Sequence, residues 1–110
     1  MDRSIAAAHV DGDMQLLGEL AAMFLKDYPR FLRAARESME QGDCAALERE
    51  AHTLKGRLAF FGVHPARDKA LELEMAGRKR DLTGASKILA EIESAMEGVL
   101  PELEALTRQS

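Results

Sequence analysis

The sequence predicts an all-α fold, an antiparallel up-down four-helix bundle with a short helical segment at the N-terminus. Helix-forming residues with straight side chains dominate the 110-residue chain. Apolar residues recur at helical spacing in four successive segments, and short turns separate these segments. Short turns make successive helices neighbours in space. The length fits a single domain, residues 1–110, with the bundle core at about 10–108.

The first long helix is expected between Asp13, a suitable N-cap, and Gly42, a suitable C-terminal residue. Pro29 lies inside this segment and predicts a kink or short break near residues 27–28, because proline has no N–H to donate. Ahead of this helix, the apolar run at residues 5–8 predicts a packed or frayed helical turn.

The second helix is expected from about Cys44 to Phe61, with Asp43 as its N-cap and Gly62 at its end. Residues at helical spacing form a single apolar stripe, which should face the core. The members of this stripe are Leu47, Ala51, Leu54, Leu58 and Phe61.

Two further helices follow. His64-Pro65 is expected to begin and cap the third, which ends around residues 77–80. Asp81 or Thr83 is the expected N-cap of the fourth. Pro101 is expected to bend that last helix before its final apolar residues.

Composition argues against several classes of function. The net charge of −4 is unfavourable for nucleic-acid binding, and no apolar stretch is long enough to span a bilayer. The single cysteine, Cys44, allows no internal disulfide and fits a reducing cytoplasm. Neither a Gly-rich phosphate loop nor a cluster of metal ligands is present, so no cofactor or metal of its own is expected. We expect a monomeric cytoplasmic protein that contacts neither nucleic acid nor a membrane.

His52 is the most informative of the three histidines, because His9 and His64 lie at or beyond helix ends. At 100° per residue from Leu47, the rest of the apolar stripe falls within about 40°, whereas His52 falls at about 140°. Its imidazole is therefore expected on the exposed face. A neutral imidazole nitrogen is a nucleophile near pH 7, and phosphoryl transfer needs mainly positioning and charge compensation.

The neighbours of His52 have a use if it accepts a phosphoryl group. Lys55, one turn along, could compensate the phosphoryl charge. Gly56 costs about 1 kcal/mol of helix propensity relative to alanine, and its missing side chain would let a partner approach. The small side chain of Ala59 leaves the surface beside His52 unobstructed. By themselves, these residues fit an ordinary surface histidine beside a lysine somewhat better than a phosphorylation site.

The run from Ala51 to Gly56, Ala-His-Thr-Leu-Lys-Gly, resembles the phosphorylation motif of histidine-containing phosphotransfer (HPt) domains, Ala-His-x-Leu-Lys-Gly. The likeness covers about residues 10 to 105 and is strongest to HPt domains at the C-terminal end of hybrid sensor histidine kinases. Further matching positions are Gly12-Asp13, Leu16-Leu17, Phe24-Leu25, Gly42-Asp43, Phe61-Gly62, Ala70 and Leu73-Glu74.

The resemblance implies a four-helix bundle that carries a phosphoryl group on His52, with Lys55 assisting electrostatically and Gly56 giving access. The partner would be the receiver domain of a response regulator or hybrid histidine kinase, whose aspartate gives or takes the phosphoryl group and which supplies the magnesium ion. The chain would be a phosphorelay carrier in two-component signalling and not an enzyme, whether freestanding or part of a hybrid kinase. The docking surface is expected to include Glu48, Arg49, Lys55, Gly56 and Ala59, with neighbouring residues of the first helix.

Two residues depart from the family pattern. Arg57 and Phe60 stand where small or polar residues are common, and both lie on the side of the helix away from Lys55. We expect them to alter the docking surface. An alternative hypothesis is a helical scaffold or protein-interaction module that is never phosphorylated, and phosphate incorporation separates the two.

Overall fold

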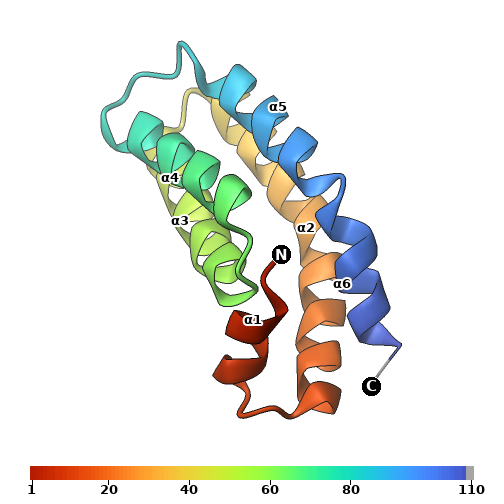
Figure 1. The fold of residues 1–110 in the computed structure, drawn as a ribbon. Helices are drawn as coiled ribbons and strands as arrows, with labels where there is room; N and C mark the ends of the chain where they lie inside the picture. Colours follow the sequence, from red (N-terminus) through yellow and green to blue (C-terminus); the bar gives the residue numbers. More distant parts are fainter. Residues whose placement is uncertain (109–110) are drawn as a thin grey trace.

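The computed structural model describes residues 1–108, and every regular element in that range is an α-helix. The helices are α1 (Arg3–His9), α2 (Met14–Gln41), α3 (Cys44–Phe60), α4 (His64–Arg78), α5 (Ala85–Met96) and α6 (Val99–Thr107). Figure 1 shows α2, α3 and α4 running in alternating directions, with α5 and α6 following each other along α2. The predicted four-helix bundle is confirmed, with the α5–α6 pair as its fourth arm.

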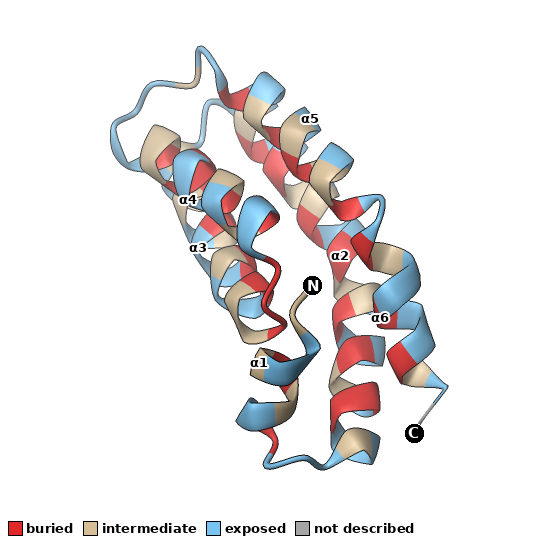
Figure 2. Cartoon of the chain, in the orientation of Figure 1, coloured by how far each residue is buried: buried red, intermediate tan, exposed pale blue. Residues whose placement is uncertain are grey.

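Buried residues line the inner faces of the helices and form one core along the bundle (Figure 2). The predicted stripe of α3 is part of this core, since Leu47, Ala51 and Leu58 are fully buried and Leu54 and Phe61 nearly so. The polar face of α3 is consequently directed outward.

Of the kink or short break predicted near Pro29, the break is wrong, because α2 is one continuous helix of 28 residues. Proline removes its own hydrogen bond to the Leu25 carbonyl and crowds that carbonyl, but Phe24, Tyr28 and Phe31 are buried on both sides of it. Core packing therefore keeps the helix unbroken, and Figure 1 shows α2 changing direction about halfway along its length.

Two predicted N-caps are confirmed. The carboxylate of Asp13 accepts a hydrogen bond from the Leu16 N–H, and that of Asp43 accepts one from the Ala46 N–H, both at 3.0 Å. Gly42, with φ of 68°, ends α2 in the left-handed conformation that favours glycine. The turn between α2 and α3 thus follows directly from its residues.

The predicted start of α4 at His64-Pro65 is confirmed, but the predicted cap is wrong, because Val63 is the N-cap and His64 is the first residue of the helix. The N-cap of α5 is Gly84 and makes no side-chain hydrogen bond. The carboxylate of Asp81 accepts a hydrogen bond from the Thr83 N–H at 3.1 Å, which stabilises a turn ahead of the helix.

The last arm is interrupted between Met96 and Val99, one turn before Pro101. Pro101 cannot donate to the Glu97 carbonyl, and its ring crowds that carbonyl. The helix is therefore interrupted at residues 97–98 and begins again at Val99. The bend was predicted at Pro101, ahead of Leu103 and Leu106, and the structure shows the interruption just before the proline.

Helix α1 is packed and not frayed, since Ala6 is fully buried. The Asp2 N–H donates to the Gly62 carbonyl at 3.1 Å, and the Asp2 carboxylate accepts from two N–H groups in the first turn of α1. Within residues 1–108, no helix combines the length and apolar character needed to cross a membrane.

Candidate functional site

The site is built where α3 and α4 approach closely. Gly77 of α4 permits the approach, because a Cβ at this position would lie 2.8 Å from the Cys44 carbonyl oxygen and 2.8 Å from the Glu48 amide nitrogen. Only a residue without a side chain lets the two backbones meet at this distance. One turn away, the same crossing brings Glu74 of α4 against the outer face of α3.

Glu74 is the centre of a charged network. Its side chain is only 3% exposed, and its Oε1 atom lies 2.7 Å from Nζ of Lys55 in an ion pair. Its Oε2 atom lies 2.9 Å from Nδ1 of His52 and 3.3 Å from a guanidinium nitrogen of Arg78. Arg78 also donates from Nε to Glu48 at 2.9 Å. A buried carboxylate is thus surrounded by three potential donors.

These contacts keep Glu74 ionised. The Lys55 ammonium is the main cause that lowers the pKa of Glu74 below its usual value; burial opposes the shift, and the hydrogen bond from His52 adds to it. An ionised carboxylate can only accept hydrogen bonds. The Nδ1 atom of His52 therefore carries its proton and donates a hydrogen bond to the Glu74 carboxylate.

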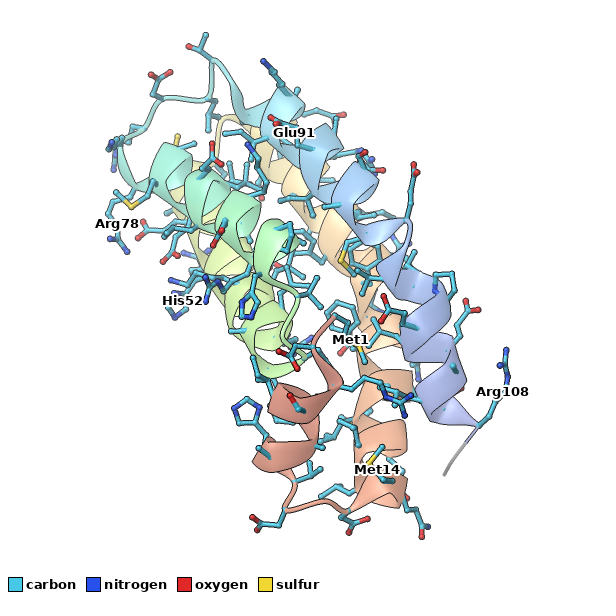
Figure 3. All side chains as sticks on the ribbon, in the orientation of Figure 1. Met1, Met14, His52, Arg78, Glu91 and Arg108 are labelled. Atoms are coloured by element: carbon cyan, nitrogen blue, oxygen red, sulfur yellow. The ribbon has the colours of Figure 1, made fainter. Side chains whose placement is uncertain are left out.

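His52 is otherwise turned toward solvent, with its side chain 68% exposed. Figure 3 shows it on the outer side of α3, near Arg78. Because Nδ1 holds the proton, Nε2 of a neutral ring keeps the free lone pair. The predicted exposure of His52 is confirmed, and the geometry makes Nε2 a nucleophile oriented by a buried anion.

The surface next to His52 is open at Gly56. A Cβ built on Gly56 has no neighbouring heavy atom within 4 Å, in contrast to Gly77. Packing inside the chain therefore does not require glycine at position 56. The predicted use of Gly56, the close approach of another molecule, remains a prediction.

A groove of about 460 Å³ lies between α2 and α3, on the opposite side of His52 from Glu74. Its most exposed apolar side chain is Met23, at 60%. Arg57 donates to Asp27 at 3.1 Å across this groove, and Phe60 stacks on His9 with ring centroids 4.7 Å apart. The lining residues are Leu20, Met23, Phe24, Asp27, His52, Thr53, Gly56, Arg57, Phe60 and Phe61.

The predicted docking residues fall on different sides of His52. Glu48 and Arg49 line a separate hollow on the α4 side of His52, together with Glu74 and Arg78. Lys55 also points toward α4, where it meets Glu74. Of the five predicted docking residues, Gly56 alone lines the groove toward α2, and Ala59 lines neither hollow.

Glu74 and Arg78 were not predicted as site residues. A usable signal was present, because Glu74 is a charged residue on the otherwise small or apolar buried face of α4, with Ala66, Ala70, Leu73 and Gly77. A carboxylate on such a face needs a partner. Within residues 1–108, no three His, Cys, Asp or Glu side chains converge in a way that could hold a metal ion.

Comparison with known proteins identifies the family of this chain. The model of the Hpt domain family matches residues 19–106. The phosphotransferase RcsD of Escherichia coli strain K12 is 29% identical over 79 residues, which are 72% of this chain and 9% of that much longer protein. The crystal structure of histidine-containing phosphotransfer protein B (HptB) from Pseudomonas aeruginosa PAO1 has the same fold, with a TM-score of 0.90, 22% identity and coverage of 100% of this chain and 96% of that one. The chain therefore belongs to the Hpt domain family, whose members carry phosphoryl groups in two-component phosphorelays.

Proposed function

We propose that His52 is the residue of this carrier that accepts a phosphoryl group from, and returns it to, an aspartate of a receiver domain. The observation that supports this assignment is the contact of 2.9 Å between Nδ1 of the exposed His52 and the buried carboxylate of Glu74. It orients the ring, sets the tautomer and leaves Nε2 facing solvent.

The transfer is a displacement at phosphorus. The Nε2 lone pair of His52 forms the N–P bond while the P–O bond to the receiver's aspartate breaks, and the electron pair of that bond leaves with the aspartate carboxylate. Nδ1 keeps its proton throughout, so the phosphorylated ring is formally cationic. The carboxylate of Glu74, 2.9 Å from Nδ1, stabilises that positive charge. The same steps in reverse return the phosphoryl group.

Lys55 has a second role in this scheme. Its ammonium sits on a flexible stem beside Glu74, and its side chain is partly exposed. When the phosphoryl group adds negative charge at Nε2, the ammonium can shift toward the phosphoryl oxygens. The receiver supplies the magnesium ion and most of the catalytic groups, so the chain is a carrier and not an enzyme by itself.

We propose that the receiver covers His52 and the open backbone at Gly56, and contacts α2 through the groove beside Met23. The carrier works as a monomer in the cytoplasm, in accordance with its free cysteine, Cys44. The same role applies whether the domain is freestanding or part of a hybrid histidine kinase.

The test uses a panel of purified receiver domains, each phosphorylated on its aspartate in the presence of magnesium. Each is mixed with wild-type chain, with His52→Gln, and with His9→Gln and His64→Gln as matched controls. We expect alkali-stable, acid-labile phosphate on the wild type and on both controls, and none on His52→Gln. Equal labelling of His52→Gln would overturn the assignment.

The scaffold hypothesis has a separate test. Phosphoramidate, a small-molecule phosphoryl donor, phosphorylates an accessible nucleophilic imidazole without a receiver. The proposal predicts that it labels His52. If neither phosphoramidate nor any receiver labels the wild type, the chain is a scaffold and the proposed function is wrong.

A further inference from the structure

We propose that Arg57 is a specificity residue that selects receivers carrying a carboxylate beside an apolar side chain. This inference rests on the proposed function and adds the chemistry of the partner's docking surface. The apolar side chain would fill the groove between α2 and α3, and the carboxylate would pair with the guanidinium of Arg57.

Arg57 is placed where a docked receiver must meet it. It follows Gly56 directly in α3, and both line the same groove as His52. A second hollow, of about 380 Å³, continues along α2 and α3 beyond Arg57. The residues that line both hollows are Phe24, Asp27, Thr53 and Arg57. The contact of 3.1 Å between Arg57 and Asp27 therefore crosses a continuous surface depression at its middle.

Arg57 can exchange partners without leaving Asp27 alone. Asp27 also lies 3.9 Å from Arg30, one turn along α2, so it keeps a nearby cation if Arg57 moves. The side chains of Arg57 and Asp27 are 49% and 36% exposed, and ion pairs this exposed contribute little to stability. Asp27 binds the guanidinium through NH1, and a guanidinium has five N–H donors in a fork that matches a carboxylate.

The groove beside Arg57 favours an apolar partner group. Met23 and Leu20 from α2 face Phe60 from α3 across it, and the stacking contact of Phe60 with His9 holds that wall in place. Beyond Arg57, the second hollow is lined by both Glu50 and Arg30, so a carboxylate there meets charges of both signs. Among the residues that line the apolar groove beside His52, Arg57 is the only arginine or lysine, so it is the cation that this groove offers to a partner's carboxylate. Charges at such a rim determine partner choice more than affinity.

The test uses a receiver that labels the wild-type chain and compares three variants. Arg57→Glu reverses the proposed contact. Asp27→Lys combined with Arg57→Glu restores an ion pair within the chain but still offers the wrong charge to the receiver. Lys87→Glu, at an exposed position of α5, is the control with the same change in charge.

We expect phosphotransfer from the receiver to slow at least tenfold in Arg57→Glu and to stay slow in the double variant. Lys87→Glu should remain within twofold of the wild type. Labelling of His52 by phosphoramidate should be unchanged in every variant, which shows that the reactivity of the His52 imidazole is intact, and thermal unfolding shows that each variant is folded. Arg57→Gln, which removes the charge without reversing it, should give an intermediate rate.

Two results would overturn the inference. Recovery of the wild-type rate in the double variant would mean that the ion pair matters only within the chain. A rate for Arg57→Glu equal to that of Lys87→Glu would mean that the receiver does not contact this residue. Either result is compatible with the proposed function. If neither a receiver nor phosphoramidate labels the wild type, the proposed function and the inference about Arg57 are both wrong.

Discussion

Nδ1 of His52 and Oε2 of Glu74 lie 2.9 Å apart, although one side chain is mostly exposed and the other almost completely buried. The two residues are 22 positions apart, on α3 and α4. The contact couples a reactive surface group to a charge in the interior. Removing that charge should therefore affect both the reactivity of the ring and the stability of the fold.

Substitutions at Glu74 should have graded effects on His52. Glu74→Gln keeps an acceptor for Nδ1–H but loses the negative charge, so the tautomer should persist while transfer slows. Glu74→Ala removes both. We expect transfer from a receiver to slow by about tenfold to a hundredfold, by analogy with the loss of a carboxylate that orients a metal-binding histidine. Quenched-flow labelling measures the rate, and the nitrogen NMR shifts of His52 report the tautomer. A wild-type rate in Glu74→Ala would show that the contact is not used.

The low pKa of Glu74 should make stability depend on pH. A carboxyl group with a lower pKa in the folded state binds fewer protons than in the unfolded state, so its stabilising contribution is present above the ordinary value of about 4.5. That contribution is lost as the pH falls through the lower, folded-state pKa. Urea unfolding of wild type and Glu74→Gln should differ most near pH 7 and converge in acid.

The same experiment on Lys55→Met checks the cause of this dependence. Lys55 contributes most to the shift, so its loss should bring the pKa of Glu74 closer to the ordinary value. The free energy of unfolding should then fall less steeply as the pH is lowered. Asp2 and Asp81 also have lowered pKa values, from hydrogen bonds to Ser4 and Thr83 respectively, and they remain in both variants. Differences between variants therefore isolate Glu74. If Lys55→Met loses stability in acid as steeply as the wild type, Lys55 is not the main cause of the lowered pKa of Glu74.

Two glycines offer a matched pair for testing access to His52. Gly56→Ala meets no atom within 4 Å, so the variant should be as stable as the wild type or up to about 1 kcal/mol more stable, while transfer from a receiver slows. Labelling by phosphoramidate should not change. Gly77→Ala should instead lose about 1–3 kcal/mol, because its Cβ collides with the backbone of α3. Thermal and urea unfolding measure the stability of both variants. Transfer at the wild-type rate in Gly56→Ala would exclude a close approach of the receiver at residue 56.

The exposed methionine in the groove provides the last prediction. Met23→Ala should change the free energy of unfolding by less than about 0.5 kcal/mol, because the side chain is 60% exposed. It should slow transfer from the receiver at least fivefold, as expected for an apolar anchor in an interface. Leu71→Ala, at an exposed apolar residue of α4, is the control and should transfer at the wild-type rate. Equal rates for the two variants would remove α2 from the docking surface.

Local signals were enough to predict the helices and the orientation of His52. Helices α2 and α3 begin at the side-chain caps Asp13 and Asp43, and α2 ends at Gly42. Each of these signals involves residues only a few positions apart, so it can be recognised in the sequence. The direction of His52 follows from its distance in residues to Leu47, because helix geometry is regular. The N-caps of α4 and α5, Val63 and Gly84, were not predicted, because neither makes a side-chain hydrogen bond that would mark it in the sequence.

The sequence by itself determined the bundle and the exposed imidazole, and the Ala-His-x-Leu-Lys-Gly motif led to the Hpt family. Only the tertiary structure decided which groups surround that imidazole. The contacts of His52 with Glu74, and of Arg57 with Asp27, join helices across the bundle. Such contacts depend on how closely two helices approach, and for α3 and α4 Gly77 permits that close approach. An interhelical distance is a property of the packed core as a whole, and no pattern within one helix encodes it.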